Sequence, residues 1–402
     1  MAKEEKKAPK LRFNGYTNDW ERKKLGDVAE KVIQKNNNNA FKNVLTNSAE
    51  YGIISQRDFF ERNIANKNNI STYYIVQNDD FVYNPRISNL APYGPINRNK
   101  TGYTGIISPL YYVFRVLNIN TAFIEWYFKT TCWHKFMYQH GDSGARSDRF
   151  SIKDNELKKL PIKLPADDME QEKIAKTLTS LDNTLQLHER KCEELALIKK
   201  ALLQKLFPKK DEFKPEVRYK NFSDAWEQRK LGEVATFING RAYKQNELLD
   251  SGKYKVLRVG NFYTNDSWYY SNLELADKYY IDKGDLVYTW SATFGPHIWD
   301  GEKVIYHYHI WKIELSESLD RDFTLQILEA DKAKLLANTN GSTMIHVTKK
   351  DMESKVISLP NIEEQKQIGS YLMKFDSLIA LHQRKLEKLK QLKKFLLQNM
   401  FI

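Results

Sequence analysis

The chain of 402 residues contains an internal repeat, and this repeat limits its fold more than any other feature. The segment Trp20–Ala29 returns 206 positions later as Trp226–Ala235, with seven of ten residues identical. A second pair of copies, Gln171–Phe207 and Gln365–Phe401, is separated by 194 positions. Repeat units of solenoid proteins are about 20 to 50 residues long, so a period near 200 indicates two domain-sized halves. Each half is expected to be a globular part followed by a helix.

The second pair of copies has the pattern of a coiled coil. Apolar residues recur at alternating intervals of four and three, from Ile174 to Leu206 and from Ile368 to Met400. Each helix, at about 39 residues, is on the order of 58 Å long. The residues expected at the helix-pair interface are Leu178, Leu181, Leu185, His188, Leu195, Leu202, Leu372, Phe375, Ile379, His382, Leu389 and Leu396.

Polar residues at matched core positions predict how the two helices run. His188 and His382 lie near the middle of their helices, so they meet in either orientation. A parallel pair would place Lys199 against Lys393, whereas an antiparallel pair separates these like charges. We therefore predict an antiparallel pair with adjacent histidines. A metal site is the alternative, but two histidines without Cys or carboxylate partners are too few.

The remaining segments predict mixed globular parts. Runs rich in Val, Ile, Tyr and Phe read as strands at 73–76, 80–83, 111–114, 255–259, 285–290 and 309–313, and helices are expected over 122–139 and 323–337. Leu-Pro pairs at 160–161 and 359–360 mark extended entries into the long helices. The predicted organisation is a flexible tail over 1–12, globular parts over 13–165 and 209–360 (with a linker over 209–218), and helical regions over 166–208 and 361–402.

Composition narrows the class of protein. The net charge of +12 is compatible with an anionic partner. Two cysteines, Cys132 and Cys192, offer neither a disulfide framework nor a zinc spacing, which fits a reducing compartment. The N-terminus lacks the apolar segment of a signal peptide, and no apolar run approaches the roughly 18 residues of a membrane span. We expect a cytoplasmic protein that does not contact a membrane.

Motifs that resemble catalytic sites are incomplete. Gly141–Gly144 is similar to the nucleophile loop of trypsin-like proteases, but the histidine motif of that family is missing. Asn84–Ile87 is similar to a methyltransferase loop without its second proline and aromatic residue. His307 and His309 share one side of a strand and are more typical of packed residues than of metal ligands. There is no phosphate-binding loop for ATP. The sequence therefore predicts a chain that is not an enzyme.

Taken together, these features resemble the specificity subunit of type I restriction–modification enzymes. The resemblance rests on the paired Trp-Glu-x-x-Lys-Leu-Gly openings, on Gly284–Ser291 with its fainter counterpart Asp80–Asn84, and on the Leu-Pro entries before Gln-x-x-Ile helices. It implies a mixed α/β (α+β) fold of two target-recognition domains separated by two long antiparallel coiled-coil helices, with pseudo-two-fold symmetry. It also implies that each domain reads one half of an asymmetric bipartite site in double-stranded DNA. The expected partners are two methyltransferase subunits and, through them, nuclease/translocase subunits.

The resemblance implies no cofactor in this chain, since S-adenosylmethionine, ATP and Mg²⁺ belong to the partner subunits. DNA contacts are expected from Lys, Arg and polar loop residues, although any one of them could instead be a solvated surface or turn residue. The candidates are Arg86, Asn97, Arg98, Lys100, Ser143, Arg146 and Arg149 in the first part, and Arg241, Tyr243, Lys244, Arg258, Asn261, Ser291, Thr293, Ser342, Thr343 and His346 in the second. The alternatives are a coiled-coil scaffold that binds only protein, and a stand-alone DNA-modifying enzyme with an unrecognised site.

Overall fold

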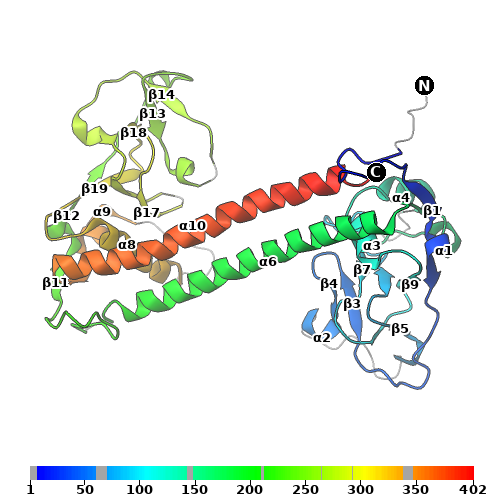
Figure 1. The fold of residues 1–402 in the computed structure, drawn as a ribbon. Coiled ribbons are helices and arrows are strands. Elements are labelled where there is room, and N and C mark those ends of the chain that lie inside the picture. The colour runs from blue at the N-terminus through cyan, green and yellow to red at the C-terminus, as the bar shows by residue number, and fades with distance from the viewer. Residues whose placement is uncertain are drawn as a thin grey trace. The chain divides into compact units, whose positions relative to one another are not determined.

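The computed structural model describes residues 7–59, 70–142, 148–209, 212–263, 265–291, 293–337 and 347–402. The chain divides into two compact units (Figure 1). Unit 1 consists of Met1–Leu187 and Lys385–Ile402, and unit 2 of His188–Arg384. Each unit therefore contains one globular part together with a segment of both long helices. In the part of the chain that the structure describes, no helix combines the length and apolar character needed to cross a membrane.

Unit 1 begins with the first copy of the repeated opening segment. Its strands are β1 (Glu21–Lys24), β2 (Ala29–Lys31), β3 (Leu45–Ser48), β4 (Gly52–Ser55), β5 (Tyr74–Val76), β6 (Phe81–Tyr83), β7 (Ile96–Arg98), β8 (Gly105–Ile107), β9 (Tyr112–Val116) and β10 (Pro161–Leu164). Its helices are α1 (Leu25–Val28), α2 (Gln56–Phe59), α3 (Thr121–Phe128), α4 (His134–His140), α5 (Asp154–Leu157), the start of α6 (Asp168–Lys205) and the end of α10 (Ile362–Asn399).

Unit 2 contains the second copy of the opening segment. Its strands are β11 (Glu227–Lys230), β12 (Ala235–Asn239), β13 (Tyr254–Leu257), β14 (Tyr269–Ser271), β15 (Tyr280–Ile281), β16 (Leu286–Thr289), β17 (Gly295–Ile298), β18 (Val304–Tyr306), β19 (Ile310–Leu315) and β20 (Val356–Leu359). Its helices are the end of α6, α7 (Leu231–Val234), α8 (Arg321–Ala337), α9 (Lys349–Ser354) and most of α10 (Ile362–Asn399).

The central sheets of the two units share one topology, although their sequences diverge. The strand order is β2-β9-β6-β7 in unit 1 and β12-β19-β16-β17 in unit 2, with antiparallel neighbours throughout. The second layers differ. Unit 1 has the two-stranded pairs β3-β4 and β5-β8, whereas unit 2 has a four-stranded sheet, β14-β13-β18-β15. The fold is thus a mixed α+β repeat, and the two copies differ most in the second layer.

A turn conserved between the two halves fixes the start of each central strand. Before β6, the Asp80 carboxylate accepts a hydrogen bond from the backbone N–H of Gln77, and before β16, Asp285 does the same with Asp282. The residue preceding each aspartate has a positive φ, +72° at Asp79 and +96° at Gly284. Asp and Gly tolerate this left-handed region better than β-branched residues do, which explains the Asp-Asp and Gly-Asp pairs.

The repeated tryptophan builds each core around the end of a long helix. In unit 1, the ring centroid of Trp20 lies 5.9 Å from that of Phe123 and 6.4 Å from that of Phe401. In unit 2, Trp226 lies 6.0 Å from Phe323 and 6.2 Å from Phe207. Phe207 precedes Trp226 along the chain, whereas Phe401 lies at the opposite end of the chain from Trp20. The residue that follows the end of α10 thus does for unit 1 what the residue that follows the end of α6 does for unit 2.

Backbone and ion-pair contacts repeat the same closure. The N–H of Leu11 donates to the carbonyl of Asn399, and the N–H of Val217 donates to that of Lys205, both at 2.9 Å. Arg12 forms a two-pronged ion pair with the buried Glu170, and Arg218 forms one with the buried Glu364. The prediction of a flexible tail is therefore wrong for Leu11 and Arg12, because these pairings anchor them. Residues 1–6 lie outside the described part of the chain.

The two long helices, 38 residues each, pair in an antiparallel orientation within each unit. In unit 2, a ring nitrogen of His188 lies 2.6 Å from one of His382, so that one Nδ1 donates a hydrogen bond to the other. Lys199 forms an ion pair with Asp376 in unit 2, and Lys393 forms one with Asp182 in unit 1. The predicted antiparallel orientation, the adjacent histidines and the separation of the two lysines are all confirmed.

The predicted interface residues are all at least half-buried. Leu178, Leu185, Leu195 and Leu372 are buried, and Leu181, His188, Leu202, Phe375, Ile379, His382, Leu389 and Leu396 are half-buried. The helix predicted over 122–139 is interrupted. It ends at Phe128, and α4 begins at His134, because the Thr130 hydroxyl donates to the carbonyl of Tyr127 and competes with helix continuation.

His297 gives unit 2 a stability that depends on pH. Its ring stacks on Phe262 at 4.3 Å, and burial lowers its pKa from 6.5 to about 4. The unfolded chain therefore takes up a proton between these values while the folded chain does not, so stability is lost as the pH falls from about 6.5 towards 4. We expect His297→Gln to reduce the loss of stability between pH 7.5 and pH 5 by at most about 2 kcal/mol. Urea unfolding at pH 7.5 and 5 measures it; an unchanged pH dependence, or an equal change in the exposed His140→Gln, contradicts it.

Candidate nucleic-acid interface

In both units, the end of the central strand (β6 or β16) lies beside the turn that leads into the strand paired with it (β9 or β19). Tyr83, the last residue of β6, is paired with Tyr112, the first of β9, and Thr289 at the end of β16 is paired with Ile310 at the start of β19. The loop after the central strand therefore lies beside the turn 108–111 in unit 1 and 307–309 in unit 2. We call this region the strand-end surface of each unit. Loops at strand ends carry recognition residues on a rigid scaffold.

The strand-end surface of unit 1 contains a pocket of about 750 Å³. Arg86 and Arg149 line it from opposite sides of a backbone bridge, in which the N–H of Phe150 donates to Pro85 at 2.8 Å. The side chains of Gln56 and Tyr111 also line the pocket. Two guanidinium groups and an amide offer donors for phosphates and for base edges.

Three predicted residues of unit 1 lie on or just after β7 and have other roles. Asn97 is only 5% exposed, and its amide donates to the side chain of Asn47 at 2.7 Å and accepts from Lys129 at 2.6 Å. Asn97 is thus part of the buried structure, which does not favour its predicted contact with DNA. Arg98 and Lys100 both pair with Glu125, at 3.3 Å and 2.8 Å. That carboxylate offsets their charge and weakens the case for a phosphate contact.

The strand-end surface of unit 2 is basic and aromatic. Arg241 forms a backbone bridge with His307, and its guanidinium donates to Glu247 at 2.7 Å, which raises the pKa of Arg241. The indole N–H of Trp290 donates to the carbonyl of Tyr308 at 3.0 Å, and the Trp290 ring lies 4.9 Å from that of His309. These contacts gather cationic, aromatic and imidazole groups on one surface, a combination suited to stacking and base-edge contacts.

Protonation states on this surface follow from burial. Burial lowers the pKa of His307 to about 4, and the neighbouring His309 and Arg258 contribute to the shift. Burial also lowers the pKa of His309. Both imidazoles are therefore neutral at physiological pH, and each carries one donor and one acceptor nitrogen. Among the described residues, no group of three or more His, Cys, Asp or Glu side chains could hold a metal ion.

The other predicted residues of unit 2 have mixed placements. Arg258 stacks on Tyr269 at 4.3 Å and donates to the carbonyl of Ser267 at 2.9 Å. The Asn261 amide donates to the carbonyls of Asn265 and Ser267, so it holds its own loop together. The Tyr243 hydroxyl donates to the carbonyl of Tyr306, and burial raises the pKa of Tyr243. Lys244 and Thr293 are exposed, and Ser291 is half-buried after β16.

Several predictions lie outside the described residues, and several candidates escaped prediction. Ser143, Arg146, Ser342, Thr343 and His346 belong to segments that the structure does not describe. The additional candidates on the strand-end surfaces are Gln56, Tyr111, Trp290, His307, Tyr308 and His309. Most of them share a position in the sequence: they follow the central strand (β6 or β16) or precede the strand paired with it (β9 or β19).

Comparison with known proteins agrees with the repeat. A model of the type I restriction modification DNA specificity domain matches residues 17–197 and 223–391. A putative type I restriction enzyme MjaX specificity subunit of Methanocaldococcus jannaschii is 30% identical over 257 residues, which cover 61% of this chain and 59% of that protein. The type I restriction enzyme EcoBI specificity subunit of Escherichia coli is 27% identical over 160 residues, covering 39% of this chain and 33% of that protein. The matched regions thus span less than two thirds of these relatives.

Solved structures show the same fold. A type I restriction-modification S subunit from M. genitalium has a TM-score of 0.64 at 15% identity, covering 98% of this chain and 99% of that one. A chain from work on the complex assembly and conformational transition of the type I R-M system has a TM-score of 0.52 at 16% identity, with coverage of 95% and 97%. Two copies of the family domain account for most of the sequence, and the chain therefore belongs to the type I restriction–modification DNA specificity family.

Proposed function

We propose that this chain is the DNA sequence-specificity subunit of a type I restriction–modification complex. The observation that carries the proposal is the presence of two family domains, each with its own strand-end surface. Each surface reads one half of a bipartite site in double-stranded DNA. The two surfaces carry different side chains, with Arg86, Arg149 and Gln56 in unit 1 and Arg241, Trp290 and His309 in unit 2. The two halves of the site are accordingly different, and the whole site is asymmetric.

In this proposal the chain is not an enzyme, and the chemistry belongs to its partners. Two methyltransferase subunits bind it and use S-adenosylmethionine, and nuclease/translocase subunits that use ATP and Mg²⁺ join through them, in the cytoplasm. Support for assembly comes from the fold shared with a chain studied in the complex assembly of a type I R-M system. The net charge of +12 favours approach to the DNA polyanion.

DNA retention by the assembled complex tests the proposal. We expect the complex of this chain with its methyltransferase subunits to bind duplex DNA, with an affinity that falls linearly on a log–log scale as salt rises. A complex that retains no DNA at low salt would instead favour the protein-only scaffold. Purified chain that methylates or cuts DNA without partners would favour the stand-alone enzyme.

The paired helices are expected to set the length of the unread spacer between the half-sites. Inserting seven residues, two helical turns, at matched positions in α6 and α10 lengthens each helix by about 10 Å. At about 3.4 Å per base pair, the spacer should grow by about 3 base pairs, while both half-site sequences stay the same. Mapping of methylated sites measures this. An unchanged spacer, or altered half-site sequences, would refute this role of the helices.

A further inference from the structure

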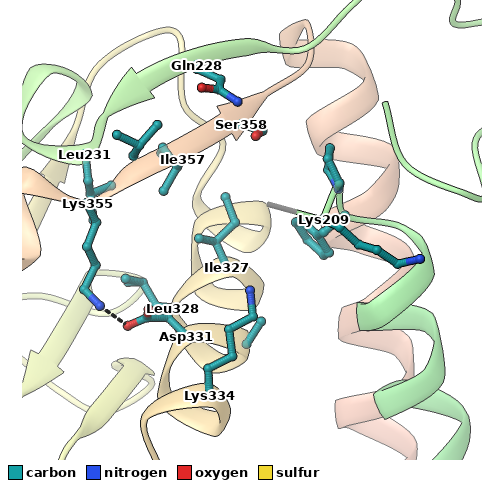
Figure 2. Close-up of a pocket in the computed structure, with 14 residues that line it drawn as sticks. Lys209, Gln228, Leu231, Ile327, Leu328, Asp331, Lys334, Lys355, Ile357 and Ser358 are labelled. Carbon is teal, nitrogen blue, oxygen red and sulfur yellow. Dashed lines mark hydrogen bonds and ion pairs between the residues drawn. The ribbon is translucent and has the colours of Figure 1, made fainter. Parts of the chain in front are cut away.

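Unit 2 contains a pocket that lies away from its strand-end surface. It has a volume of about 600 Å³ and lies between α8, the β11–β20 pair and the residues after α6 (Figure 2). Leu231, Ile327, Leu328 and Ile357 give it apolar walls, and Figure 2 shows Ile327 between the strand residues and Lys209. Val356, which also lines it, is 61% exposed. An apolar pocket with an exposed apolar residue at its mouth is typical of a binding site.

The internal repeat identifies the residue that occupies the equivalent position in unit 1. Asn120 caps α3 by accepting a hydrogen bond from Phe123, and Asp320 accepts the matching bond from Phe323. The offset between the two helices is therefore 200 residues. By that offset, Ile327 corresponds to Tyr127, a larger side chain with a hydroxyl group.

Tyr127 fills its site in unit 1 completely. It is 2% exposed, its hydroxyl donates to the carbonyl of Pro161 at 2.8 Å, and its ring lies 6.4 Å from that of Phe401. The counterpart of Pro161 is Val356, because Pro161 is paired with Lys24 and Val356 with the equivalent Lys230. The counterpart of Phe401 is Phe207, the last residue of the other copy of the helical repeat. Both line the pocket of unit 2. The pocket is thus the space that a tyrosine side chain occupies in the other half of the molecule.

The charged residues at the rim of the pocket indicate the chemistry of a segment that could bind there. Lys209 and Lys334 are exposed there, while Lys355 is paired with Asp331 at 2.6 Å. Three lysines against one aspartate leave a net positive rim, which favours acidic residues on a bound segment. A second copy of this chain is a poor occupant, because two chains of charge +12 repel each other.

We propose that this pocket binds a tyrosine side chain of a partner protein, presented on a short acidic segment. The ring occupies the space between Ile327, Phe207 and Ile357, and the hydroxyl donates to the carbonyl of Val356. Acidic residues on either side of the tyrosine contact Lys209 and Lys334. This proposal is independent of DNA recognition, which would stand if the pocket bound nothing.

The test uses the full chain and a fluorescein-labelled peptide with one tyrosine between two acidic residues on each side. We expect saturable binding by fluorescence polarisation, with a dissociation constant no weaker than on the order of 1 mM. Ile327→Tyr fills the pocket from within, as Tyr127 does in unit 1, and is expected to weaken binding by about tenfold or more while the chain stays folded. Lys334→Glu should also weaken binding, whereas Lys350→Glu, an exposed lysine outside the pocket, should not.

Other outcomes overturn the proposal. Equal affinity for a peptide with alanine in place of tyrosine, or for one with lysine flanks, would exclude the proposed ligand. Binding unchanged in Ile327→Tyr, or absent from the wild-type chain, would exclude the pocket. Self-association in sedimentation velocity that Ile327→Tyr abolishes would show that a second copy occupies the pocket instead of a partner.

Discussion

Replacing Phe401 by alanine is expected to destabilise unit 1 by about 3 to 5 kcal/mol, although this residue is next to the last in the chain. Its side chain is only 4% exposed and packs against Trp20, Phe123 and Tyr127. Removing the ring leaves a cavity between aromatic groups that belong to the opposite end of the sequence. Urea unfolding followed by tryptophan fluorescence measures the loss.

Phe395 provides the matched control. It lies on α10, six residues before Phe401, and is 52% exposed. Phe395→Ala should change the free energy of unfolding by no more than about 0.5 kcal/mol. Similar small effects of both substitutions would mean that Phe401 does not complete the core of unit 1.

The second large effect is expected from Arg86→Ala, in DNA binding by the assembled complex. Arg86 is exposed after β6 and lines the pocket opposite Arg149. Loss of a guanidinium contact to a base edge costs about 1 to 3 kcal/mol and relaxes specificity at one position of one half-site. A phosphate contact predicts instead a uniform weakening and a smaller salt slope. Competition binding with a set of single-base variants separates the two.

Arg190→Ala, an exposed arginine on α6, is the control for loss of one positive charge. It should leave the specificity profile unchanged. If Arg86→Ala binds every DNA variant as the wild type does, Arg86 does not contact DNA, and the strand-end surface of unit 1 needs a different assignment.

The parts of the fold that repeat in sequence could be predicted from it. The heptad spacing predicted both long helices. The matched His and Lys positions predicted their antiparallel orientation, because a helix interface does not accommodate two lysines placed opposite each other. The shared sheet topology could not be predicted from the sequence. A strand of three or four residues needs only a short apolar pattern, and many different sequences have such a pattern. The single exception was the Asp before each central strand, whose turn requires a special backbone conformation.

The candidate site was harder to predict because exposure and pairing are tertiary properties. Asn97 has a residue type suited to base recognition, yet its amide is used within the buried structure. His307 and His309 looked like packed strand residues, yet they lie at the turn before β19, beside Trp290. Arg86 and Arg149, 63 positions apart in sequence, are brought together by a backbone bridge that no local pattern encodes.

The central claim is that each unit reads one half of an asymmetric DNA site. Its most direct test is co-expression of the chain with its methyltransferase subunit, followed by mapping of methylated adenines for the wild type and for His307→Ala/His309→Ala. We predict a bipartite, asymmetric site in the wild type, and in the double variant a change confined to one half-site. A contiguous or symmetric site, or a change in both halves, would contradict the account.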